Sequence, residues 1–181
     1  MDKLARRKHA AIATVVASAL LMSVTTGLNA ENLMVYIEAR DPNQLERLDD
    51  EEKQLKVDYF LSAIEAGIMD AFFEADYVVF NAGPVSGADE SGRRSEAHVL
   101  TVAQQGGADL LIRLAVRFDT EGGGAPEPNL GELAVYQVAG EEEILSHQVR
   151  LAELVDGALE LSGEVGFKIG TAIAQRVLEN S

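Results

Sequence analysis

The chain has 181 residues, no cysteine, no tryptophan and a formal net charge of −15 at pH 7. Its length allows one domain with a hydrophobic core of its own. The absence of cysteine excludes disulfides, thiolate metal ligands, cysteine nucleophiles and acylation at an N-terminal cysteine.

The charge is unevenly distributed along the chain. Residues 1–30 hold four of the 15 basic and one of the 30 acidic side chains, so residues 31–181 have a net charge of −18. Such a surface repels nucleic acid and anionic lipid headgroups. It attracts a basic partner, although dispersed acidic residues also serve simply to keep a domain soluble.

The first thirty residues have the layout of a secretory signal peptide. Four basic residues between Lys3 and Lys8 precede the apolar run 10–24, and the small residue Ala30 precedes Glu31. This pattern predicts cleavage after residue 30 and export of the remainder, residues 31–181, as a single domain. The alternative is an uncleaved N-terminal anchor, because the run from residue 10 onward is close to the minimum length that spans a bilayer.

The first half of the exported part alternates between strand and helix signals. Residues 33–39 and 77–82 are short apolar runs bounded by turn residues, and they predict strands. Apolar residues at helical spacing predict a helix over 49–75. A second helix is predicted over 96–105, with Gly106 as its left-handed cap.

The second half predicts three strands and a helix. In the strand 110–118 the even-numbered residues are all apolar and the odd-numbered ones include arginine, so one face meets helices and the other is partly exposed. A loop rich in Gly and Pro, 119–131, leads to strands 133–139 and 144–151, which complete an antiparallel meander. Helical spacing predicts a last helix over 165–177.

These elements predict an α+β domain with the order β-α-β-α-β-β-β-α. We expect a two-layer sandwich, with a mixed sheet of about five strands and three helices on one face. Gly67 and the small-residue row Gly166, Gly170 and Ala174 are expected to let the helices lie close on the sheet.

No group of side chains indicates a catalytic, cofactor-binding or metal-binding site. His98 and His147 are far apart in the sequence and lack clustered carboxylates, which makes a metal site the weaker interpretation. No phosphate-binding loop and no nucleophile elbow is present.

Arg113 and Arg117 form the candidate partner or ligand face. They project from the same side of one predicted strand in a very acidic protein, where they could bind a carboxylate, a phosphate or a protein partner. The alternative is that they pair with the protein's own acids, such as Glu132 or those at 141–143.

The order of elements and a few residues resemble a group of bacterial envelope domains. The resemblance rests on the helix end Phe72-Phe73, the strand Tyr77-Val78-Val79 and the strand entry Gly107-Ala108-Asp109-Leu110-Leu111-Ile112. The group comprises the curli-secretion CsgG-like lipoproteins, the lipoprotein activators of penicillin-binding proteins and the N-terminal domain of the Tol-system protein TolB. Its second hairpin often carries Asp-x-x-Thr-Gly-Glu, whose Asp and Thr are missing here at residues 138–142. Its lipidated members also carry an N-terminal cysteine that this chain lacks.

The resemblance covers roughly residues 33–178 and implies an α+β domain used for protein–protein contact rather than catalysis. We therefore expect a secreted periplasmic, non-catalytic accessory module that binds an envelope protein, and a basic protein is one candidate for that partner. It would need no cofactor, metal, nucleic acid or lipid anchor. Two alternatives stay open: a periplasmic domain that binds a small anionic ligand or acts as an enzyme, and a form anchored by its N-terminus in the inner membrane, facing the periplasm.

Overall fold

A computed structural model describes residues 31–40, 51–82, 95–119 and 126–179. Glu31–Ser181 form one compact unit. The predicted signal segment and its cleavage site lie outside the described residues, as do the predicted helix start at 49–50 and residues 120–125 of the predicted loop.

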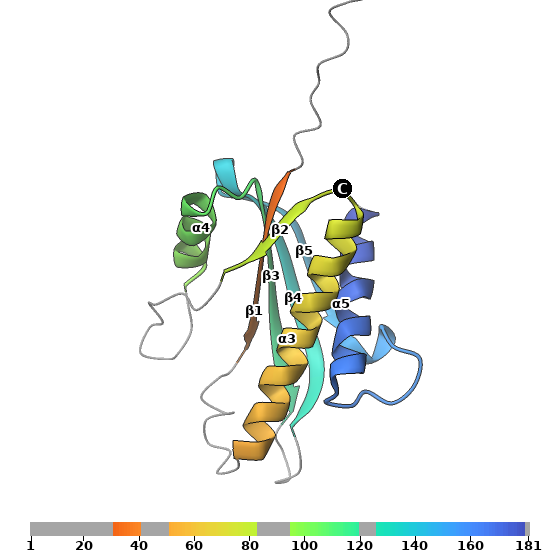
Figure 1. Ribbon diagram of the computed structural model, residues 1–181. Coiled ribbons are helices and arrows are strands. Elements are labelled where there is room, and N and C mark those ends of the chain that lie inside the picture. The colour runs from red at the N-terminus through yellow and green to blue at the C-terminus, as the bar shows by residue number, and fades with distance from the viewer. Residues whose placement is uncertain (1–30, 41–50, 83–94, 120–125, 180–181) are drawn as a thin grey trace, which may run out of the picture. The chain divides into compact units, whose positions relative to one another are not determined.

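The described elements confirm the predicted α+β class and the predicted element order (Figure 1). Three helices and five strands follow one another in the described part of the chain. They are β1 (Asn32–Ala39), α3 (Glu51–Glu74), β2 (Val78–Asn81), α4 (Glu96–Gln105), β3 (Leu110–Asp119), β4 (Glu127–Gln137), β5 (Glu142–Arg150) and α5 (Gly163–Leu178).

The five strands form one mixed sheet in the order β2-β1-β3-β4-β5. β1 is parallel to both β2 and β3, whereas β3, β4 and β5 form the predicted antiparallel meander. β4 begins at Glu127, six residues before the predicted strand, so the loop is shorter than expected. The reason is that Pro128 is accommodated at the strand's start, beside a register shift between Arg117 and Phe118.

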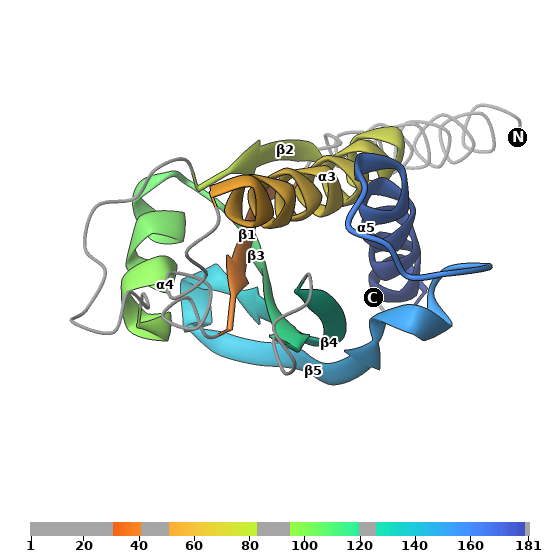
Figure 2. The same ribbon diagram turned by 90° about the horizontal axis from the view of Figure 1, so that it is seen from below.

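One face of the sheet is covered by α3 and α5, which lie side by side (Figure 2). The main core lies between this helix pair and the strands. Its buried strand residues include Leu33 and Val35 of β1 and Ile112, Leu114 and Val116 of β3, which are the even-numbered face predicted for that strand.

α4 lies on the opposite face, which corrects the expectation of three helices on one face (Figure 1). Val99, Leu100 and Ala103 of α4 pack on Met34 and Tyr36 of β1 in a second, smaller core. Handedness explains the difference. The connection β1–α3–β2 moves outward across the sheet and β2–α4–β3 moves back past β1. Crossovers between parallel strands are almost always right-handed, so two crossovers in opposite directions place their helices on opposite faces.

The small-residue row packs on α3 and not on the sheet. A Cβ added at Gly170 would meet the carbonyl oxygen of Ile64, and one added at Gly67 would meet the carbonyl oxygen of Phe167. Gly166 faces Phe60 in the same way. The two helices therefore approach backbone to backbone, and the missing side chains make that approach sterically possible.

Candidate functional site

The half of the sheet face that α4 leaves uncovered forms a groove of about 580 Å³. Its base is formed by the small side chains of Ala115 on β3 and Ala134 on β4. In the β3–β4 register, Ala134 lies opposite Arg113 and Ala115 lies opposite Glu132. Because both alanine side chains are small, the sheet surface is hollow at this place. The residues that line it are Glu38, Arg40, Glu96, Arg113, Ala115, Glu132, Leu133, Ala134, Tyr136, Glu143, Ser146, His147 and Gln148.

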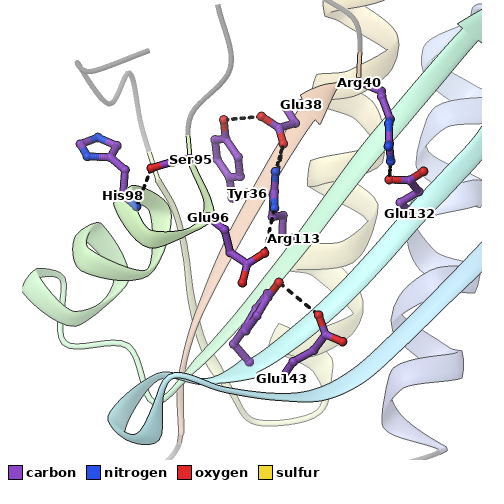
Figure 3. A network of polar contacts seen from close by, with 10 residues as sticks. Tyr36, Glu38, Arg40, Ser95, Glu96, His98, Arg113, Glu132 and Glu143 are labelled. Carbon is purple, nitrogen blue, oxygen red and sulfur yellow. Dashed lines mark hydrogen bonds and ion pairs between the residues drawn. The ribbon is translucent and has the colours of Figure 1, made fainter. Parts of the chain in front are cut away.

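Arg113 lies in the groove and is held by acids from two other elements (Figure 3). Its Nη2 and Nε donate to Oε1 of Glu38 at 2.6 and 3.1 Å. Its Nη1 lies 3.6 Å from Oε2 of Glu96, in the first turn of α4. The Arg113 and Glu38 side chains are only 21% and 13% exposed, so the pair is largely withdrawn from water.

The environment of this pair stabilises the charged guanidinium. Burial is the largest single influence and lowers the pKa of Arg113, but the hydrogen bond and the charge of Glu38, with smaller effects of Tyr136 and Glu96, raise it above its usual value. Tyr36 adds a hydrogen bond of 3.0 Å from its hydroxyl to Oε2 of Glu38. Arg113 is therefore fixed in place by the protein's own carboxylates.

The pKa of Tyr136 reflects its burial and the negative charges in the same part of the groove. The residue is 2% exposed, and its hydroxyl donates to Glu143 at 3.3 Å. Burial raises the pKa of this phenol well above its ordinary value, and the carboxylates of Glu96 and Glu143 raise it further, against a smaller opposite effect of Arg113. Two carboxylates thus disfavour any additional negative charge between them.

The second arginine of the groove is also paired. Arg40, just after β1, forms an ion pair with Glu132 of β4, and both side chains remain 30–39% exposed. The groove therefore holds four glutamates and two arginines, and both arginines have carboxylate partners. Its surplus charge is negative, concentrated at Glu96 and Glu143.

The structure separates the two arginines of the predicted face. Both lie on β3 with the expected side-chain alternation, but Arg117 is exposed and is not among the groove residues. Four residues of extended strand put the two about 13 Å apart. Arg113 has the internal acid partners named as the alternative, although they are Glu38 and Glu96 rather than Glu132 or the acids at 141–143.

The two histidines His98 and His147 lie on different elements. His98 lies on α4, where its backbone N–H donates to the Ser95 side chain that caps the helix, and His147 lies on β5. Within residues 31–40, 51–82, 95–119 and 126–179, no three His, Asp or Glu side chains are grouped so as to hold a metal ion.

Sequence reasoning missed Glu38, Glu96 and Tyr136 as members of the groove. Glu38 was part of a short apolar strand, and nothing local marks it as the partner of a residue 75 positions away. One usable signal was Tyr136 near Glu143 across the predicted hairpin, because aromatic and acidic residues on one face of a meander share a surface.

No helix in the part of the chain that the structure describes is long and apolar enough to cross a membrane.

Comparison with known proteins adds little to the geometry. No family model matches the chain, and no curated protein matches it. Among solved structures, the chain is similar to a PelC dodecamer from Paraburkholderia phytofirmans, with 13% sequence identity and a TM-score of 0.41, over 80% of this chain and 87% of that chain. A likeness at this level carries no functional argument.

Proposed function

We propose that the protein is a non-catalytic interaction module of the bacterial cell envelope, exported to the periplasm, that holds a basic segment of a partner protein in the groove. The observation that carries the proposal is the surplus of carboxylates around two arginines that are already paired. A Lys or Arg side chain entering the groove would meet the exposed carboxylates of Glu96 and Glu143. Of the existing ion pairs, it would compete with the longer one of Arg113, in which Glu96 lies 3.6 Å away, and not with the Arg113–Glu38 contact at 2.6 Å.

The charge of the groove also weighs against the anionic-ligand alternative. A carboxylate or phosphate could bind Arg113 only by competing with Glu38, at 2.6 Å, while lying near Glu96. Like charges at that distance repel, and the partly buried pair would lose its own hydrogen bonds. Arg117, which is exposed, cannot supply a second contact from about 13 Å away.

Export is supported by the leader-like sequence of residues 1–30 and by the independent compactness of Glu31–Ser181. Mass spectrometry of the intact protein recovered from the periplasm tests this part. A chain that begins at Glu31 agrees with a cleaved signal peptide, and a chain that begins at Met1 in the membrane fraction supports the anchored form instead.

Photocrosslinking in cells tests the groove. A photoreactive amino acid replaces Gln148, an exposed groove residue, and in a control protein it replaces Ala158, an exposed residue outside the groove. We expect one dominant adduct from position 148, attached to a Lys- or Arg-rich segment of the partner, and none from position 158. If neither position gives an adduct and anionic metabolites raise the Tm, the ligand-binding alternative is favoured.

A further inference from the structure

The outer side of α3 carries large apolar side chains that its own fold does not bury. The sheet-facing side is already apolar, with Val57, Phe60, Ile64, Ile68 and Phe72 in the core. A second apolar row lies on the other side, where Leu55, Tyr59 and Phe73 are 66%, 66% and 72% exposed. A helix that is apolar on both sides is usually covered on both sides.

The exposed residues form a single row on α3. Leu55, Tyr59, Ala66 and Phe73 are separated by four, seven and seven positions, which at 100° per residue places them within about 40° of one another. The row is about 27 Å long from Leu55 to Phe73. Ser62 and Ala66 lie between its large ends, so small side chains occupy its middle.

α5 extends the row sideways. The ring of Tyr59 lies over the start of α5, where a Cβ added at Gly163 would be 2.6 Å from it. Phe167, one helical turn after Gly163, is 39% exposed. We define the outer ridge as Leu55, Tyr59, Ala66, Phe73 and Phe167. Single exposed apolar residues are common, but five along one pair of helices indicate a contact surface.

The charges beside the ridge restrict its occupant. The exposed charged residues of α3 are Glu51, Glu52, Lys56, Asp58, Asp70 and Glu74. The only lysine among them is paired with Glu52 at 2.7 Å. A second copy of the chain would bring the same acids together, and an anionic membrane would be repelled. A helix whose apolar side chains are flanked by Lys and Arg would cover the ridge and would pair with the acids beside it.

We propose that the outer ridge is a second docking surface, which binds a basic amphipathic helix of a partner protein. The ridge and the groove lie on opposite faces of the sheet. The domain would therefore hold two partner segments at once, which goes beyond the function proposed for the groove.

A synthetic helix tests the proposal. The probe is a dye-labelled 18-residue peptide of Leu and Lys with leucine on one helical face, and its binding to the full chain is measured by fluorescence polarisation. We expect Tyr59→Ser combined with Phe73→Ser to weaken binding at least tenfold, because two large aromatic anchors of the contact are lost. Both residues are exposed, so far-UV circular dichroism and the Tm should stay unchanged.

Matched controls separate the ridge from the groove and from charge alone. Ile144→Ser removes another exposed apolar side chain, 52% exposed on β5, and Glu96→Gln with Glu143→Gln neutralises the groove. Ile144→Ser should bind the peptide as well as the wild type does. In the Glu96→Gln/Glu143→Gln background, where the groove attracts a basic peptide less, the ridge variant should still bind at least tenfold more weakly than its parent. A scrambled peptide of the same composition should bind tenfold more weakly than the amphipathic one. The proposal would be overturned if the ridge variant bound the peptide as tightly as the wild type does. It would also be overturned if the ridge proved necessary for self-association in sedimentation, or for binding to phosphatidylcholine–phosphatidylglycerol vesicles.

Discussion

At the scale of single residues, Arg113 lies in the groove, as a ligand-binding arginine would, but its contacts are with carboxylates of the protein itself. Its pairing with Glu38 is largely buried, so removing one partner leaves the other charge without compensation. We expect Arg113→Met to lower the free energy of unfolding by about 2–3 kcal/mol in urea titrations. Arg117→Met, on the same strand but exposed, should change it by less than about 0.5 kcal/mol.

A double-mutant cycle isolates the contact itself. If Glu38 and Arg113 act as a pair, the effects of Glu38→Gln and Arg113→Met are not additive, and their coupling is about 1–2 kcal/mol. Additive effects would mean that Arg113 is not stabilised by Glu38 and is free to bind a ligand.

Tyr136 gives a second prediction at this scale. Because burial and two carboxylates raise its pKa, the folded protein holds the phenolic proton more tightly than the unfolded chain does. The resulting stabilisation is complete below the unfolded pKa of about 10 and is lost as pH rises through the folded value. In ultraviolet titration of the four tyrosines, we expect one phenol to stay protonated above the ordinary pKa of a tyrosine. That late step should disappear in Tyr136→Phe, and its persistence there would assign it to another tyrosine.

The residues of the groove were only partly predictable. Period-2 alternation placed Arg113 and Arg117 on one face correctly, because alternation is a local property of a strand. The partner of Arg113 depends on the β1–β3 register, which sets Tyr36 opposite Arg113 and is fixed by the tertiary fold. The helix cap shows the same limit on a smaller scale. Gly107, with φ of 73°, takes the left-handed conformation predicted for Gly106, whose φ is −75°.

At the scale of elements, the contact between α3 and α5 depends on glycine. A Cβ at Gly170 would meet the backbone of Ile64 and Ile68, which cannot move aside as a flexible side chain would. We expect Gly170→Ala to destabilise the fold by about 1–3 kcal/mol in urea, despite the higher helix propensity of alanine. Gly140→Ala is the control, because its Cβ would meet only Glu142 at 3.9 Å. An unchanged stability in Gly170→Ala would mean that the helices are farther apart than described.

The elements themselves were predicted well, whereas the sheet face that α4 covers was not. Long periodic segments and the cap at Ser95 gave the bounds of α4 directly, since they depend on neighbouring residues. The location of α4 depends on strand order, because right-handed crossovers assign a face only when the direction of each crossover is known. Leu111 and Tyr136 then become core residues beneath α4, on a face expected to be partly exposed.

At the scale of the whole molecule, the proposed function depends on where the negative charge lies. The net charge of −18 for residues 31–181 attracts basic proteins in general. The groove combines surplus carboxylates with a hollow of about 580 Å³. General attraction would be screened by salt and shared by all acidic positions, whereas a docked segment would depend on Glu96 and Glu143 in particular.

The most direct test compares two variants of equal net charge in the crosslinking experiment at position 148. Glu96→Gln with Glu143→Gln removes the surplus negative charge of the groove. Glu160→Gln with Glu179→Gln removes two exposed acidic residues outside the groove. We predict that the first pair reduces the adduct at least tenfold and that the second pair leaves it unchanged. Equal adduct yields from the two variants would contradict docking of a basic segment in the groove.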